Sequence, residues 1–238
     1  MDCRYAPRRV RILIAATIVA ATLTAPAAAR TPKPIERVDA FLTFFDQLAL
    51  KQQDTFGWRP KWVRRWDGPV AVRLGGLGTA KLRPKLAAML RDLSQWTGVS
   101  FRLDPPGAYA RRILISVKPH SYFENRYGAR KLVCTAATYG RRGRLRRSYV
   151  EISAKFTDCL AHELMHALGF DGHWFGRPGG MAMRSVMAHR YSSLRAPYFS
   201  KWDQMAIRLL YHERLRPGMA RTTVLPMARS LTEPGPTL

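Results

Sequence analysis

The chain has 238 residues, of which 47% are hydrophobic, and 40 lysines and arginines against 16 acidic residues give a formal net charge of +24. This length and apolar content allow one sizeable core, while no segment reaches the about 20 consecutive apolar residues typical of a membrane span. The charge predicts affinity for anions, such as an anionic envelope surface, cell-wall polymers or nucleic acid.

Residues 1–29 have the three parts of a secretory signal peptide. Basic MDCRYAPRRVR is followed by apolar ILIAATIVAATLT and by the small residues APAAA. We expect cleavage after Ala29 and export to the periplasm or to the outside of the cell. The removed segment carries four arginines and one aspartate, which leaves the remaining chain at +21.

The rest of the chain predicts a single α+β domain over 30–216 with a mixed sheet, because strands gather before a central helix and further helices pack on them. Apolar spacing predicts helices over 35–50, 84–96, 157–169 and 201–215. Alternating apolar residues predict strands over 69–76, 101–104, 111–117 and 149–154. Pro84 is expected in the first turn of its helix. The Pro- and Thr-rich segment 217–238 is expected to be a flexible tail.

Two of the three cysteines predict a disulfide. Cys3 leaves with the signal peptide, and in an oxidising compartment Cys134 and Cys159 would pair. The bridge would fix the start of the helix over 157–169, where Thr157 or Asp158 is expected to cap the first turn.

The run RRGRLRR, residues 141–147, lies between YG and SYVEI and predicts the exposed loop of a hairpin. It is the one dense arginine cluster in an otherwise dispersed charge. Because an exported protein rarely meets nucleic acid, we expect affinity for an anionic envelope surface rather than specific nucleic-acid binding.

The stretch CLAHELMHALGFDGHW, residues 159–174, predicts a metal site on a helix. His162 and His166 are four residues apart, so one helix face presents both imidazoles to a single ion. Glu163 is placed to hold and deprotonate a metal-bound water. Gly169 is expected to end the helix in a left-handed turn. The opposite face carries the expected core positions Leu160, Leu164, Met165 and Leu168.

A zinc site of this type needs a third protein ligand. His173 is the first candidate, followed by Asp171 and then by Asp203. Glu213 and His189 also remain open.

HELMHALG is similar to the first part of the metzincin metallopeptidase signature HExxHxxGxxH, with one extra residue before His173. SVM, residues 185–187, resembles the Met-turn of that group, which implies that Met187 is a hydrophobic floor beneath the metal. This resemblance implies a zincin-like domain.

A second resemblance covers CLAHELMHALGF together with WDQMAIRLLYHERLRPGM, residues 202–219. These segments resemble a bacterial family of exported proteins catalogued as domain of unknown function 2927. The family has no established activity, so this resemblance implies fold and export rather than chemistry.

Together these features predict an exported zinc-dependent metallopeptidase that binds one zinc ion and hydrolyses a protein or peptide substrate. Glu163 would act as the general base, and Tyr191 is the candidate for stabilising the oxyanion. The alternative is a non-enzymatic zincin-fold module that binds the envelope and has a structural or vestigial metal site. Nucleic-acid binding through residues 141–147 ranks below both.

Overall fold

This computed structural model describes residues 38–50, 62–128, 132–174, 185–188 and 198–233, all within one compact unit. The signal peptide predicted over 1–29 lies outside the described residues, as do His189 and Tyr191. Among the helices of the described segments, none has the length and apolar character needed to cross a membrane.

Five strands form one mixed sheet, which confirms the predicted α+β class. They are β1 Val70–Gly76, β2 Phe101–Leu103, β3 Arg112–Lys118, β4 Cys134–Arg141 and β5 Arg144–Ser153. Their order is β2-β1-β3-β5-β4, and only β4 pairs antiparallel to its neighbour. Burial alternates along β3, so that Ile113, Ile115 and Val117 lie on the side of the strand that faces the core.

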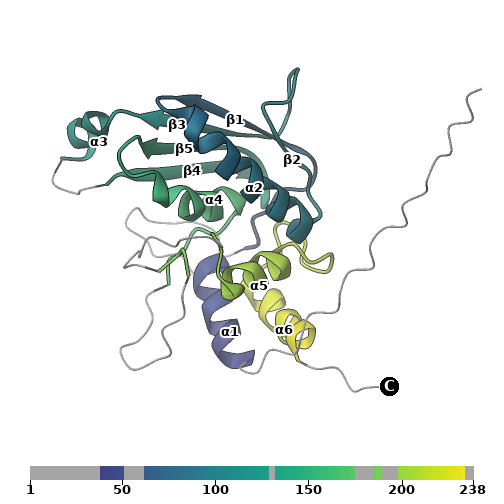
Figure 1. Cartoon of the computed structure of the whole chain (residues 1–238). Helices are drawn as coiled ribbons and strands as arrows, with labels where there is room; N and C mark the ends of the chain where they lie inside the picture. The colour runs from purple at the N-terminus through teal and green to yellow at the C-terminus, as the bar shows by residue number, and fades with distance from the viewer. Residues whose placement is uncertain (1–37, 51–61, 129–131, 175–184, 189–197, 234–238) are drawn as a thin grey trace, which may run out of the picture. The chain divides into compact units, whose positions relative to one another are not determined.

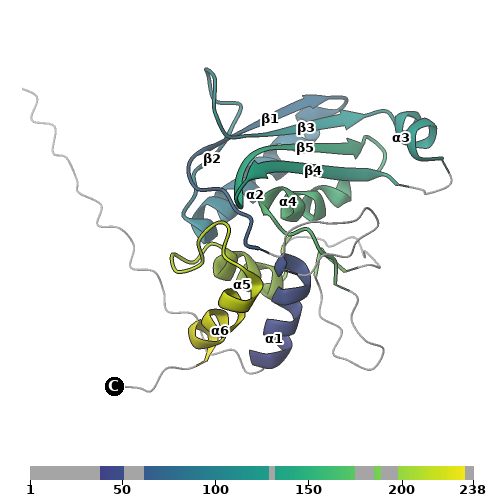
Figure 2. The same cartoon turned by 180° about the vertical axis from the view of Figure 1, so that it is seen from behind.

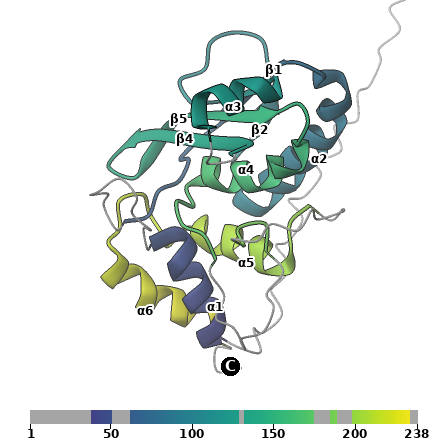
Figure 3. The same cartoon turned by 90° about the vertical axis from the view of Figure 1, so that its left-hand side faces the viewer.

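The helices lie mainly on one side of this sheet. They are α1 Val38–Phe45 with its π-helical continuation η1 Asp46–Leu50, α2 Thr79–Thr97, α3 His120–Tyr127, the 3₁₀ turn η3 Thr157–Cys159, α4 Leu160–Leu168, α5 Lys201–Leu210 and α6 Arg221–Thr232. Helices α2 and α4 run along one face of the sheet (Figures 1 and 2). Helices α1, α5 and α6 lie beyond α4, on its side away from the sheet (Figure 3). Helix α4 is therefore held between two layers.

The position of α4 is fixed by its apolar face and by the carbonyls of its last turn. The four predicted core residues of this helix are all buried. Trp66 Nε1 donates to the carbonyl of Ala167 at 2.9 Å, and Tyr211 Oη donates to that of Leu168 at 2.9 Å. Because the last carbonyls of a helix have no partner within it, these distant side chains stabilise its end.

Several predicted boundaries were wrong by a few residues. Helix α2 begins at Thr79 rather than at Pro84, because the burial of Leu82 stabilises an additional turn. Pro84 has no N–H to donate to the carbonyl of Ala80, but Ala80 is exposed, so the helix tolerates this proline. Helix α5 ends at Leu210 rather than near residue 215. Arg65 Nη1 draws the carbonyls of Leu210, His212 and Leu215 into one cluster at 2.7–3.1 Å.

Two other expectations at chain turns are also corrected. Neither Thr157 nor Asp158 caps α4; Asp158 instead pairs with Lys85, and the predicted cysteine pair holds the start of the helix. Cys134 and Cys159 lie at disulfide distance with their Cα atoms 6.5 Å apart. The run 141–147 is mostly strand, because β4 and β5 extend to a turn of two residues.

The expectation of a flexible tail over 217–238 was wrong for residues 221–232, which form α6. Val224 and Ala228 are fully buried in the layer that contains α1. Arg221 makes a bidentate contact with the buried Asp46 at 2.6 and 2.8 Å. A sequence with prolines and threonines is thus ordered by tertiary contacts that lie far away in the chain.

We predict that Asp46→Asn lowers the free energy of unfolding by about 2 kcal/mol, because a charge-assisted pair to Arg221 is lost at a buried site. The matched control is Asp39→Asn, since Asp39 in α1 pairs with an arginine of α6, Arg229, as Asp46 in η1 pairs with Arg221, but Asp39 is 83% exposed. Urea unfolding should show no measurable change for the control. Equal effects of the two substitutions would contradict the ordering role of Asp46.

Candidate metal centre

The turn that follows α4 brings the chain back over the two histidines of the helix. Gly169 ends the helix with a φ of 111°, and a Cβ at this position would lie 2.1 Å from the carbonyl oxygen of Arg64. Only glycine satisfies both constraints. This confirms the predicted left-handed end of the helix.

Backbone hydrogen bonds hold the loop after Gly169. The Phe170 N–H bonds to the carbonyl of Met165 at 3.2 Å, and the Gly172 N–H bonds to that of Leu48 in η1 at 2.9 Å. The Trp174 N–H then bonds to the carbonyl of Met187 at 2.7 Å. Because these bonds fix the loop on both sides of His173, its imidazole lies opposite the helix.

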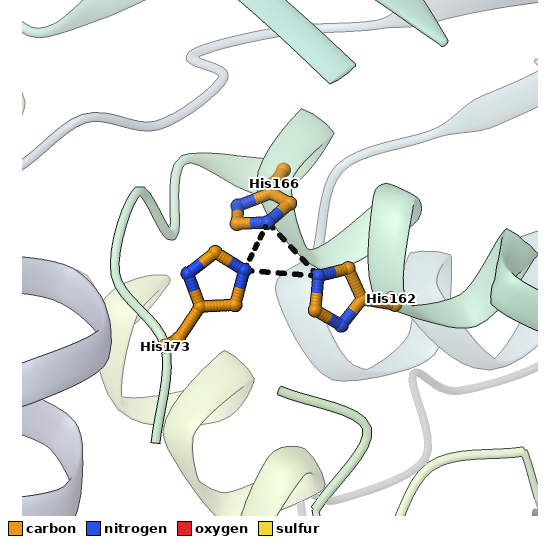
Figure 4. A group of neighbouring side chains, drawn as sticks. All are labelled: His162, His166 and His173. Atoms are coloured by element: carbon orange, nitrogen blue, oxygen red, sulfur yellow. Dashed lines mark hydrogen bonds between the residues drawn. The ribbon is translucent and has the colours of Figure 1, made fainter. Parts of the chain in front are cut away.

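The Nε2 atoms of His162, His166 and His173 converge on one point (Figure 4). They are 3.1, 3.2 and 3.3 Å apart, and they form a group that could hold a metal ion. Tetrahedral zinc with Zn–N bonds of about 2.0–2.1 Å requires N–N separations of about 3.3–3.4 Å. The three observed separations are close to these values, so His162, His166 and His173 could hold a zinc ion together.

Backbone carbonyls determine which nitrogen of each helix histidine carries the proton. His162 Nδ1 lies 2.6 Å from the carbonyl oxygen of Val186, and His166 Nδ1 lies 2.6 Å from that of Phe170. A carbonyl only accepts hydrogen bonds, so both Nδ1 atoms are the donors. In the neutral rings both Nε2 atoms then present lone pairs, as a metal ligand requires.

A second proton on these rings is disfavoured. Burial lowers the pKa of His162, against smaller raising effects from Val186 and Asp203. Burial, together with the neighbouring His162 and His173, holds the pKa of His166 well below its usual value. The Nε2 atoms of His162 and His166, which are 3.1 Å apart, therefore both carry lone pairs, and these repel each other. A cation between the two atoms would relieve this repulsion.

Glu163 follows the first histidine on α4 and is only 5% exposed. Burial raises its pKa to about 8. A cation bound by the adjacent histidines would favour the carboxylate form, since a nearby opposite charge lowers the pKa of an acid.

Residues 185–187 form the turn that supports His162. Val186 and Met187 are fully buried, and the Met187 N–H bonds to Ser185 Oγ at 3.0 Å. The carbonyl of Val186 is the acceptor for His162. Met187 thus lies in a buried turn that is hydrogen-bonded to His162. Its role as a hydrophobic floor beneath a metal stays a prediction of the Met-turn resemblance.

Asp203 anchors this turn and has no place in the histidine group. Its fully buried carboxylate accepts from Ser185 Oγ at 2.6 Å and from the Val186 N–H at 3.2 Å. It also accepts from the hydroxyl and the N–H of Ser200 at 2.7 and 2.9 Å. Burial raises the pKa of Asp203, and these hydrogen bonds partly offset the rise.

The other alternative ligands are occupied elsewhere or lie outside the described residues. Asp171 is bonded to Arg64, and Glu213 is exposed in the turn after α5. His189 and the oxyanion candidate Tyr191 lie outside the described segments. Of the candidates for the third ligand, the structure therefore brings His173 to the two helix histidines.

Neither the models of known protein families nor the curated proteins match this chain. The resemblances to the metzincins and to the exported bacterial family therefore stay predictions that rest on the quoted motifs.

The residues that support the histidine group were not predicted in that role from the sequence. The carbonyls of Val186 and Phe170 have no side-chain signal that a spacing pattern could detect. Asp203 did have one: Ser200 and Asp203 form a capping box at the start of α5, and the Ser-x-x-Asp spacing is the mark of that motif.

We predict that Asp203→Asn weakens zinc binding by roughly tenfold or more while the stoichiometry stays at one ion per chain. The NH2 group of the asparagine is itself a donor and would face N–H or O–H donors that now bond to the carboxylate. The turn would then no longer hold His162 in place. Zinc affinity is measured by competition with a chromophoric chelator, and circular dichroism checks the fold.

Glu213→Gln is the control and should leave the affinity unchanged. Ser185→Ala, which removes one of the four contacts, should give a smaller loss in a folded protein. Zinc affinity unchanged in both Asp203→Asn and Ser185→Ala would contradict the positioning role of Asp203.

Proposed function

We propose that this chain is an exported zinc-dependent metallopeptidase. The observation that carries the proposal is the convergence of three imidazole nitrogens next to Glu163, with two of the rings fixed by carbonyls in the tautomer that exposes Nε2. A purely structural ion would have no use for a general base beside it.

Zinc is the ion that fits this set of ligands best. Three protein ligands with an open fourth position are typical of catalytic zinc sites, and neutral imidazole suits this metal. His162, His166 and His173 would hold it. When bound, the ion supplies Lewis acidity, which polarises a carbonyl and acidifies a water molecule.

Glu163 would perform the proton transfers. Its carboxylate takes a proton from the water as the water oxygen adds to the peptide carbonyl carbon. As the carbon–nitrogen bond breaks, Glu163 passes that proton to the leaving amine nitrogen. Over one hydrolysis Glu163 thus takes up one proton and releases it again, and its carboxylate is restored.

An extended peptide substrate would bind beside the histidines, at the edge of the sheet. Strand β4 lies at one edge of the sheet and packs on α4. Thr138 Oγ1 in this strand donates to the carbonyl of His166 at 3.3 Å. A peptide that adds to the sheet at β4 would therefore lie close to the metal site. The net positive charge would favour acidic substrates or anionic surfaces.

The second candidate function is a non-enzymatic module with a structural metal site. The burial of Glu163, of which only 5% is exposed, favours this alternative because a general base must reach substrate. The two functions share the metal ligands and differ in what Glu163 does.

We predict that Glu163→Gln lowers peptidase activity of the zinc-loaded protein by at least about 100-fold, because general acid–base catalysis contributes about 10²–10⁴ to such a rate. Zinc content, measured by mass spectrometry, should remain at one ion per chain. A fluorogenic peptide library reports the activity.

The matched control is Glu124→Gln, since the side chain of Glu124 is 64% exposed on α3. It should retain the wild-type rate. If zinc-loaded wild-type protein cleaves nothing in the library, the enzyme proposal fails and the non-enzymatic module stands.

A further inference from the structure

The tip of the hairpin between β4 and β5 surrounds a hollow that is separate from the histidine group. Its volume is about 470 Å³, and it is lined by Arg141, Arg142, Arg144, Arg146 and Pro217. Four arginines therefore line an open hollow whose volume is in the range of small-molecule sites.

The backbone of this tip is fixed against neighbouring segments. A Cβ on Gly143 would lie 2.1 Å from Gly218 N and 2.3 Å from the carbonyl oxygen of Val63, so the turn is in close backbone contact with both. The Arg65 N–H donates to the carbonyl of Gly143 at 2.9 Å, and the Leu145 N–H donates to that of Arg65 at 3.0 Å. The arginines consequently extend from a rigid frame rather than from a free loop.

Arg142 occupies a backbone conformation that its residue type disfavours. Its φ is 50°, in the left-handed region where the first position of such a turn favours asparagine, aspartate or glycine. An arginine here adds a fourth charge to the hollow at the expense of turn preference. Strained residues of this kind concentrate at functional sites.

The charges around the hollow are only partly neutralised within the chain. Asp67 pairs with Arg144 at 3.0 Å and with Arg111 at 2.7 Å. Burial would raise the pKa of Asp67, but Arg111, Arg144 and Arg146 lower it below its usual value. Within the described segments, no acidic side chain forms an ion pair with Arg141, Arg142 or Arg146.

We propose that this hollow binds a compact ligand that carries at least two phosphate groups. Guanidinium groups contact phosphate oxygens in bidentate pairs, which favours phosphate over a single carboxylate where several arginines meet. The concave shape favours a small polyanion over the flat contact of a nucleic-acid duplex. Such phosphates could belong to a soluble metabolite or to a lipid headgroup, and the binding chemistry is the same.

The test is isothermal titration of the purified protein with inorganic tripolyphosphate at physiological salt, where loose ion pairing is screened. Arg141→Gln/Arg146→Gln should weaken binding at least tenfold. The control Arg91→Gln/Arg102→Gln removes the same charge from exposed positions on α2 and β2, and β2 lies at the opposite edge of the sheet from β4. It should change the affinity by less than twofold. Circular dichroism verifies both folds, and Arg142→Gln provides a single substitution should the pair misfold.

Vesicles that contain cardiolipin distinguish the two sources. A lipid headgroup is identified if the protein binds these vesicles, if tripolyphosphate displaces it from them, and if the Arg141→Gln/Arg146→Gln variant no longer binds them. Tripolyphosphate binding without vesicle binding identifies a soluble ligand. The proposal is overturned if wild-type protein does not bind tripolyphosphate, if the two double variants lose equal affinity, or if only oligonucleotides bind.

Discussion

Two hydrogen bonds from imidazole Nδ1 atoms to backbone carbonyls determine what this site can do. They place the proton of His162 on the Val186 side and that of His166 on the Phe170 side, which leaves the Nε2 lone pairs converging. Each carbonyl is held by its own structure. Asp203 fixes the turn that contains Val186, and the glycine end of α4 fixes Phe170. A histidine group that could hold a metal ion, built on a helix of nine residues, thus depends on segments well outside that helix.

The surrounding fold limits the movement of that helix at both ends. The cysteine pair joins its start to β4, while Trp66 and Tyr211 bond to the carbonyls of its last turn. The bond from Gly172 to Leu48 connects the loop of the third histidine to the first helical segment. Tertiary hydrogen bonds, rather than loop length alone, therefore determine where His173 lies.

Local signals in the sequence predicted the local parts of the structure. Helix spacing predicted the shared face of His162 and His166, and alternation predicted the buried side of β3, because both depend on backbone periodicity. Long-range partners were not predictable in this way. The pairing of Asp46 with Arg221 orders α6, and the Arg64 contact removes Asp171 from the metal group, yet both partners are distant in sequence. The family resemblances and the peptidase activity remain proposals.

The proposed zinc ion would be held by three imidazoles and one exchangeable oxygen ligand, and X-ray absorption at the zinc edge counts these ligands. We expect three imidazole nitrogens and one oxygen at about 2.0–2.1 Å in the wild-type protein. Two imidazoles are expected after His173→Ala. A first shell with sulfur, a wild-type spectrum with only two imidazoles, or a protein that takes up no zinc would contradict it.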